Sequence, residues 1–66
     1  MKFEDLQVVK TIVDFPERKI LAGEIGAVVA CLKVPHEAYL VEFVNDDGST
    51  KAMFVILPEH IELANL

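Results

Sequence analysis

The feature that most constrains the fold is a pair of glycines, Gly23 and Gly26, directly before a β-branched apolar run. Glycine accepts positive φ angles and lets another segment of backbone approach closely, which other residues resist. A glycine pair that leads into residues such as Val28 and Val29 therefore predicts a sharp turn that delivers the chain into a strand. We interpret Gly23 and Gly26 as structural turn residues and expect a strand over residues 27–33.

Four more segments rich in β-branched and aromatic residues indicate further strands, because such side chains suit a half-buried pleated surface. Asp47-Gly48 between two such segments is the strongest hairpin signal, and we predict that Asp47 and Gly48 are turn residues. Residues 58–60 begin with proline and predict a single helical turn. The five predicted strands cover residues 7–13, 27–33, 38–44, 50–57 and 61–63.

This order of elements predicts an all-β fold, a small five-stranded SH3-like barrel over residues 1–66 as a single domain. It has a long first loop, expected to be anchored by Phe15, Ile20 and Leu21, and one short helical turn before the last strand. A five-stranded OB barrel is the alternative, but it usually carries a helix between strands three and four. The turn at 45–48 leaves no room for that helix.

Charge and composition exclude some partners and favour others. The net charge is −5, from 11 acidic and 6 basic side chains, and only Arg18 and Lys19 are adjacent cations. Nucleic acid and anionic lipid are bound by neutralising cations, so we predict neither as a partner. No apolar run is long enough to span a membrane, and no apolar signal segment follows Met1. We therefore expect a cytoplasmic protein. Because 53% of its residues are hydrophobic, we expect a protein partner or a homo-oligomer.

Few residues of this chain could carry chemistry, and we predict no catalytic, cofactor-binding or metal-binding residues. Cys31 is the one cysteine and lies inside an apolar run, which favours an inert core thiol. His36 and His60 fall in different predicted loops and give too few ligands for zinc. No hydroxyl side chain lies beside a histidine in the sequence, as a nucleophile activated by a neighbouring base would.

Alternation along residues 38–44 indicates a candidate protein-binding face. Side chains two apart share a face, so Tyr39, Val41 and Phe43 are expected to face the core and Leu40 and Val44 to face outward. The apolar run across the hairpin turn must also leave about half of its side chains outside. The candidate face consists of Leu40, Val44, Met53 and Val55. The alternatives are that the two faces are reversed, or that a terminal segment covers this one: the N-terminal segment with Phe3 and Leu6, or the tail from Leu63 to Leu66.

A pattern spread over nearly the whole chain resembles a known family. It consists of Val8-Val9, Ile12, Asp14, Pro16, Leu21, Gly23, Gly26, Val28-Val29, Ala38-Tyr39, Val41-Glu42-Phe43, Asp46, Gly48, Thr50 and Leu57. On these residues the chain resembles a small bacterial family, domain of unknown function 4926. The resemblance implies a compact SH3-like barrel and no known function or catalytic residues. The sequence departs from the family pattern at Leu40 and Val44, where polar residues are usual, and in the run 53–56.

These observations favour an uncharacterised, non-enzymatic protein-interaction module. It would be self-associating, or a partner protein of the antitoxin or immunity type. The first alternative is a nucleic-acid-binding or ribosome-associated module, since Gly26-Ala27-Val28 is similar to part of KOW-type SH3-like modules. The second alternative is an accessory subunit of an enzyme, since the layout is similar to the SH3-like barrel of the nitrile hydratase β subunit.

Overall fold

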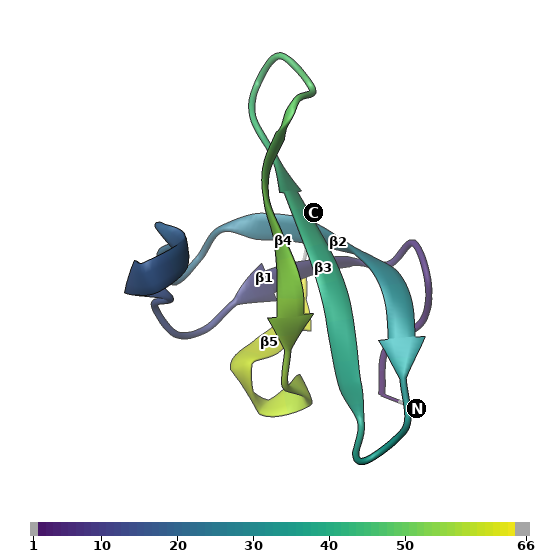
Figure 1. Ribbon diagram of the computed structural model, residues 1–66. Helices are drawn as coiled ribbons and strands as arrows, with labels where there is room; N and C mark the ends of the chain where they lie inside the picture. Colours follow the sequence, from purple (N-terminus) through teal and green to yellow (C-terminus); the bar gives the residue numbers. More distant parts are fainter. Residues whose placement is uncertain (1, 65–66) are drawn as a thin grey trace.

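The computed structural model describes residues 2–64 and contains one antiparallel sheet of five strands (Figure 1). The strands are β1 (Val8–Thr11), β2 (Ile25–Leu32), β3 (Ala38–Val44), β4 (Thr50–Ile56) and β5 (Ile61–Leu63). Single 3-10 turns, η1 (Pro16–Arg18) and η2 (Pro58–His60), lie in the first loop and before β5. The predicted all-β class is confirmed.

The strand order is β4-β3-β2-β1-β5, with β2 at the centre. Within residues 2–64, β4 and β5 each pair with one neighbour, so the sheet is not closed and the word barrel describes it only loosely. Over residues 2–64, no helix has the length and apolar character needed to cross a membrane.

The sheet bends at β2, which pairs with β1 on one side and with β3 on the other. The start of β2 pairs with β1, where Ala27 lies opposite Val8, and its end pairs with β3, where Cys31 lies opposite Tyr39. The register with β3 shifts between Val28 and Ala30, as at a β-bulge, which bends and twists a strand. Figure 1 shows β2 curving along its length, with β1 running across the β3–β4 hairpin behind it.

The core fills the space between the two halves of the bent sheet. It takes Val9 from β1 and Ile61 from β5, and the alternate residues Tyr39, Val41 and Phe43 from β3. The predicted inward face of residues 38–44 is therefore confirmed. Further buried members are Phe3, Ile20, Val28, Phe54 and Ile56.

The first strand is shorter than predicted, because the chain turns away after Thr11. The Ile12 amide donates to the carbonyl oxygen of His60, and the Thr11 hydroxyl donates to the carbonyl oxygen of Leu21 at 2.8 Å. The same hydroxyl accepts from the Glu24 amide at 3.1 Å. Thr11 is buried and its hydrogen bonds close the base of the first loop, so the strand cannot continue to residue 13.

The first loop folds back on the sheet, as predicted, through Ile20 and Phe15. Ile20 is buried, and the Phe15 ring packs edge-on against Phe54 with centroids 5.2 Å apart. The Arg18 guanidinium lies 4.9 Å from the centre of the Phe54 ring, a favourable cation–π distance. Leu21 was predicted as a third anchor, but its side chain is 61% exposed. Only its backbone holds the loop in place, through hydrogen bonds to Thr11 and Glu24.

The two glycines of the predicted turn have different roles. Gly23 lies in a turn with a φ of +91°, where most side chains would strain the backbone. Gly26 was predicted as a turn residue, but it lies inside β2, opposite Val9. A Cβ at Gly26 would lie 2.7 Å from Val41 Cγ1 and 2.9 Å from Phe43 Cε1. Gly26 is needed for close packing and not for the turn.

The other predicted boundaries lie within two residues of those observed. Residues 38–44 and 61–63 are strands as predicted, and β4 ends one residue before the predicted end at Leu57. β2 begins two residues earlier than predicted and ends one residue earlier. The Ala64 amide donates to the carbonyl oxygen of Val8, and residues 65 and 66 of the predicted tail lie outside the described residues.

Candidate functional site

The four residues of the predicted face, Leu40, Val44, Met53 and Val55, all lie on the side of the β3–β4 hairpin opposite the core. We call them the outer face. Leu40 lies directly opposite Val55 and is half-buried, whereas Val44, Met53 and Val55 are 56%, 51% and 52% exposed. Their neighbours along the strands, such as Val41 and Phe54, are buried. The predicted direction of β3 and β4 is correct.

Phe3 of the N-terminal segment does not cover the outer face. Its ring packs edge-on against Tyr39 on the core side, with centroids 5.1 Å apart, and Phe3 is buried. Leu6 is 82% exposed and therefore covers little. The alternative in which Phe3 and Leu6 shield the outer face is wrong, and the face is open over the described part of the chain.

A carboxylate lies in the middle of the outer face. Glu42 follows Leu40 and precedes Val44 on this side of β3, and it lies opposite Met53 on β4. The Thr50 hydroxyl donates to Glu42 Oε2 at 2.6 Å. Between Lys2 and Ala64 the two ion pairs are Lys10–Glu62 and Lys51–Glu24, so Glu42 has no cationic partner there. The alternation of residues 38–44 locates Glu42 on this face, but it does not show that the carboxylate lacks a cation.

An apolar groove runs beside Glu42. Ala27, which has only a methyl group, and the backbone of Gly26 are two of its lining residues. Ala27 lies opposite Val8 on one side and Glu42 on the other. The groove, which we call the side groove, is lined by Val8, Ile25, Gly26, Ala27, Glu42 and Val44. Val44 therefore belongs to both the outer face and the side groove, and Glu42, which lies among the outer-face residues, also lines the groove.

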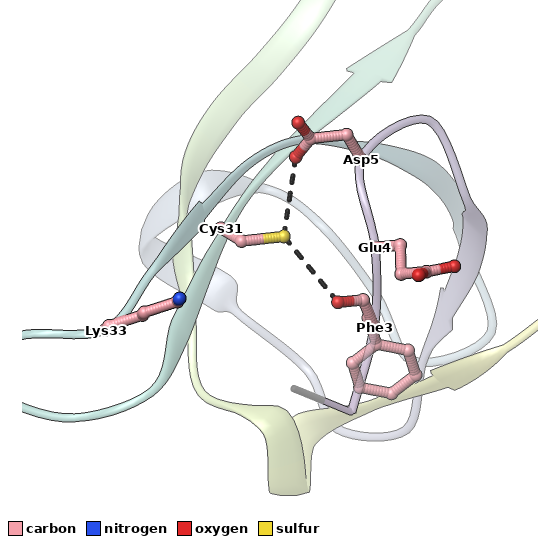
Figure 2. A pocket seen from close by; sticks show the side chains of 5 residues that line it. All are labelled: Phe3, Glu4, Asp5, Cys31 and Lys33. Carbon is pink, nitrogen blue, oxygen red and sulfur yellow. Dashed lines mark hydrogen bonds between the residues drawn. The ribbon is translucent and has the colours of Figure 1, made fainter.

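Cys31 lies at a second depression, at the N-terminal end of the molecule (Figure 2). The single S–H of the thiol has two acceptors within hydrogen-bond distance, Asp5 Oδ1 at 3.4 Å and the carbonyl oxygen of Phe3 at 3.6 Å. Figure 2 shows the Phe3 ring pointing away from the sulfur while its carbonyl oxygen points toward it. Lys33 and Glu4 complete the lining.

The surroundings of Cys31 disfavour the thiolate. Loss of hydration raises the pKa of the Cys31 thiol, and the hydrogen bond to the Asp5 carboxylate raises it further. Since the thiolate is the nucleophile, this arrangement reduces reactivity. The prediction that Cys31 lies in the core is wrong, because the residue is only partly buried and packs against the core from outside.

A hydrogen-bond network joins the N-terminal segment to the start of β3. The Tyr39 hydroxyl donates to Glu37 Oε2 and accepts from the Phe3 amide at 3.0 Å. The Lys2 amide also donates to Glu37 Oε2, at 3.0 Å. The two hydrogen bonds to Glu37 lower the pKa of its carboxyl, and the bond from Tyr39 has the larger effect. Burial raises the pKa of the Tyr39 hydroxyl. The network positions Phe3 over the core.

Asp47 and Gly48 lie in the hairpin turn after β3, as predicted, where Asp47 contributes its side chain and Gly48 its backbone conformation. Asp47 Oδ1 accepts from the Ser49 amide at 2.9 Å and from its hydroxyl at 2.6 Å. These two hydrogen bonds lower the pKa of the Asp47 carboxyl. Gly48 has a φ of +88°. Asp47 therefore has a structural role in the turn.

The histidines contribute to packing and loops. The His60 ring lies edge-on to Phe15, with centroids 6.0 Å apart, and His36 lies in the exposed loop between β2 and β3. Over residues 2–64 no three His, Cys, Asp or Glu side chains are grouped so that they could hold a metal ion.

Comparisons with known proteins give a family but no characterised relative. Neither the comparison with curated proteins nor the comparison with solved structures found a match. The model of the family described as Domain of unknown function (DUF4926) matches residues 6–63, a range that contains all five strands. The chain belongs to this family.

Proposed function

We propose that the protein is a non-enzymatic interaction module that binds a protein through the outer face. The observation that carries the proposal is the exposure of Val44, Met53 and Val55 together on one side of a two-stranded hairpin. Fully burying an aliphatic side chain contributes about 1.5–3 kcal/mol, so an interface here would gain part of that for each residue. The cost of association offsets some of the gain.

The occupant of the outer face would be another protein or a second copy of the chain. The small size and the net charge of −5 suit a role of this chain as a partner protein of the antitoxin or immunity type, and the charge favours a basic occupant over an acidic one. We place this protein binding in the cytoplasm, because a chain with a single cysteine suits a reducing compartment.

A charge-neutral double substitution tests the outer face. Val44→Lys/Met53→Glu adds one charge of each sign at two half-exposed positions, so we expect it to fold while losing the interface. Leu21→Lys/Val34→Glu adds the same charges at exposed positions outside the outer face and serves as the matched control. Circular dichroism verifies that both variants are folded.

The readout is binding by the wild type and the two variants. Each is immobilised and exposed to a lysate of the native host, and the retained proteins are quantified by mass spectrometry. We expect at least one host protein to be retained by the wild type and by the control but not by Val44→Lys/Met53→Glu, which we call the face variant. Light scattering on the same three proteins detects a second copy as the partner. The proposal fails if the three proteins retain the same set and all have the monomer mass.

A further inference from the structure

Any protein that covers the outer face must also cover Glu42. Its carboxylate lies between Leu40 and Val44 and opposite Met53, so no interface over those side chains can leave it outside. A carboxylate that loses its water without gaining a cation costs several kcal/mol or more. The Thr50 hydroxyl satisfies part of the hydrogen-bonding capacity of Glu42 but neutralises no charge.

The cation that Glu42 needs does not come from residues 2–64. Lys51 is bonded to Glu24 at 2.7 Å, and Lys10 lies 3.9 Å from Glu62. A second copy presenting the same face would bring another Glu42 and another net charge of −5. Like charges placed opposite each other in an interface are strongly unfavourable. The charges therefore disfavour a symmetric homodimer through this face and favour a basic partner.

The side groove has a shape that suits such a cation. Ala27, which lies opposite Glu42, has only a methyl group, and Val8, Ile25 and Val44 provide apolar lining. Lysine and arginine bury their aliphatic stems on apolar surface while the charged end reaches a partner. A stem lying along the side groove would bring its charged end to the free carboxylate oxygen of Glu42.

We propose that the outer face binds a protein segment in which one lysine or arginine is flanked by apolar side chains. The cation lies in the side groove and pairs with Glu42, and the flanking side chains contact Met53 and Val55. This inference rests on the proposed function, because it assigns the chemistry of the partner that the outer face would bind.

Fluorescence anisotropy with a defined probe tests the pairing. The probe is a fluorescein-labelled, acetylated and amidated peptide of alternating valine and threonine with one central arginine. The matched peptide has citrulline there, which has nearly the same shape without the charge. A hydrogen-bonded charged group contributes about 1.5–3 kcal/mol, and 1.4 kcal/mol is tenfold in affinity. We therefore expect the arginine peptide to bind the wild type at least about tenfold more tightly than the citrulline peptide.

Two carboxylate variants locate the cation. In Glu42→Gln the preference for arginine over citrulline should disappear, with little change in citrulline binding. Glu17→Gln removes the same single charge from the exposed turn η1 and should keep the preference. In an amide spectrum of the wild type, the arginine peptide should shift the signals of Gly26 and Ala27.

Three results would overturn the inference. The first is an equal arginine preference in the wild type and Glu42→Gln. The second is an affinity of the arginine peptide for the wild type weaker than about 1 mM. The third is a wild-type dimer that Val44→Lys/Met53→Glu converts to a monomer, which would make the occupant a second copy. The first two leave the proposed function standing if the face variant still loses a protein from the lysate, so the two failures are distinguishable.

Discussion

The missing side chain of Gly26 sets how closely β2 approaches the inner face of β3. The nearest atoms to a Cβ at this position belong to two core side chains, Val41 and Phe43, and to the carbonyl oxygen of Glu42 at 3.0 Å. None of these is the free end of a flexible surface side chain. Added volume would therefore have to displace either the core or the strand.

We predict that Gly26→Ala lowers the free energy of unfolding by about 1–3 kcal/mol, the usual cost of overpacking a core. Urea unfolding followed by circular dichroism measures the change. Val34→Ala, at a position that is 86% exposed, is the control and should change the stability by less than about 0.5 kcal/mol. An unchanged urea midpoint for Gly26→Ala would show that β2 and β3 are not packed as described.

At the scale of elements, one carboxylate, that of Glu37, helps to attach the N-terminal segment to the sheet. Glu37 accepts hydrogen bonds from the Tyr39 hydroxyl and the Lys2 amide, and the Tyr39 hydroxyl accepts from the Phe3 amide. Both bonds to Glu37 favour its ionised form, so its folded pKa lies below the ordinary value of 4.5. The folded state therefore binds a proton at Glu37 less readily than the unfolded state does.

This difference makes part of the stability depend on pH. A lowered folded pKa contributes stability that is complete above the unfolded pKa and is lost as the pH falls through the folded value. We predict that Glu37→Gln is less stable than the wild type near neutral pH and that the difference shrinks below about pH 4. Urea unfolding at pH 7 and pH 3 measures both differences. Glu17→Gln is the control. If the free energies of unfolding of Glu37→Gln and the wild type differ by the same amount at both pH values, the result argues against the network.

At the scale of the whole molecule, the net charge of −5 separates the proposed function from the nucleic-acid alternative. Nucleic-acid affinity comes largely from cations that release counterions from phosphates. Of the six cations, Lys10 and Lys51 face carboxylates and Arg18 lies over Phe54. The net field of such a molecule repels a phosphate backbone.

We predict no measurable binding to a short single strand or a duplex at physiological salt. Fluorescence anisotropy with labelled DNA and RNA oligonucleotides checks this, with a salt titration to reveal any electrostatic binding. Micromolar affinity with a steep salt dependence would instead favour the nucleic-acid-binding or ribosome-associated module.

The sequence by itself determined the features that depend on neighbouring residues. Alternation along residues 38–44 predicted the strand and the two sets of side chains that share a face, because side chains of a strand alternate between faces; the structure decided which set faces the core. Asp47-Gly48 located the hairpin turn, and proline located the turn before β5. The direction of Met53 and Val55 followed from the same alternation once the hairpin was known.

Only the tertiary structure decided what depends on distant segments. The first strand ends at Thr11 because its hydroxyl bonds to Leu21 and Glu24, which lie 10 and 13 residues away. Gly26 is a packing residue because β3 lies against it. Glu42 is the centre of the candidate site because the fold puts a groove beside it and pairs Lys10 and Lys51 with other carboxylates. Local conformational preferences depend on consecutive residues and can be predicted from the sequence. Whether a charge is paired or a space is filled depends instead on which distant segments come into contact when the chain folds.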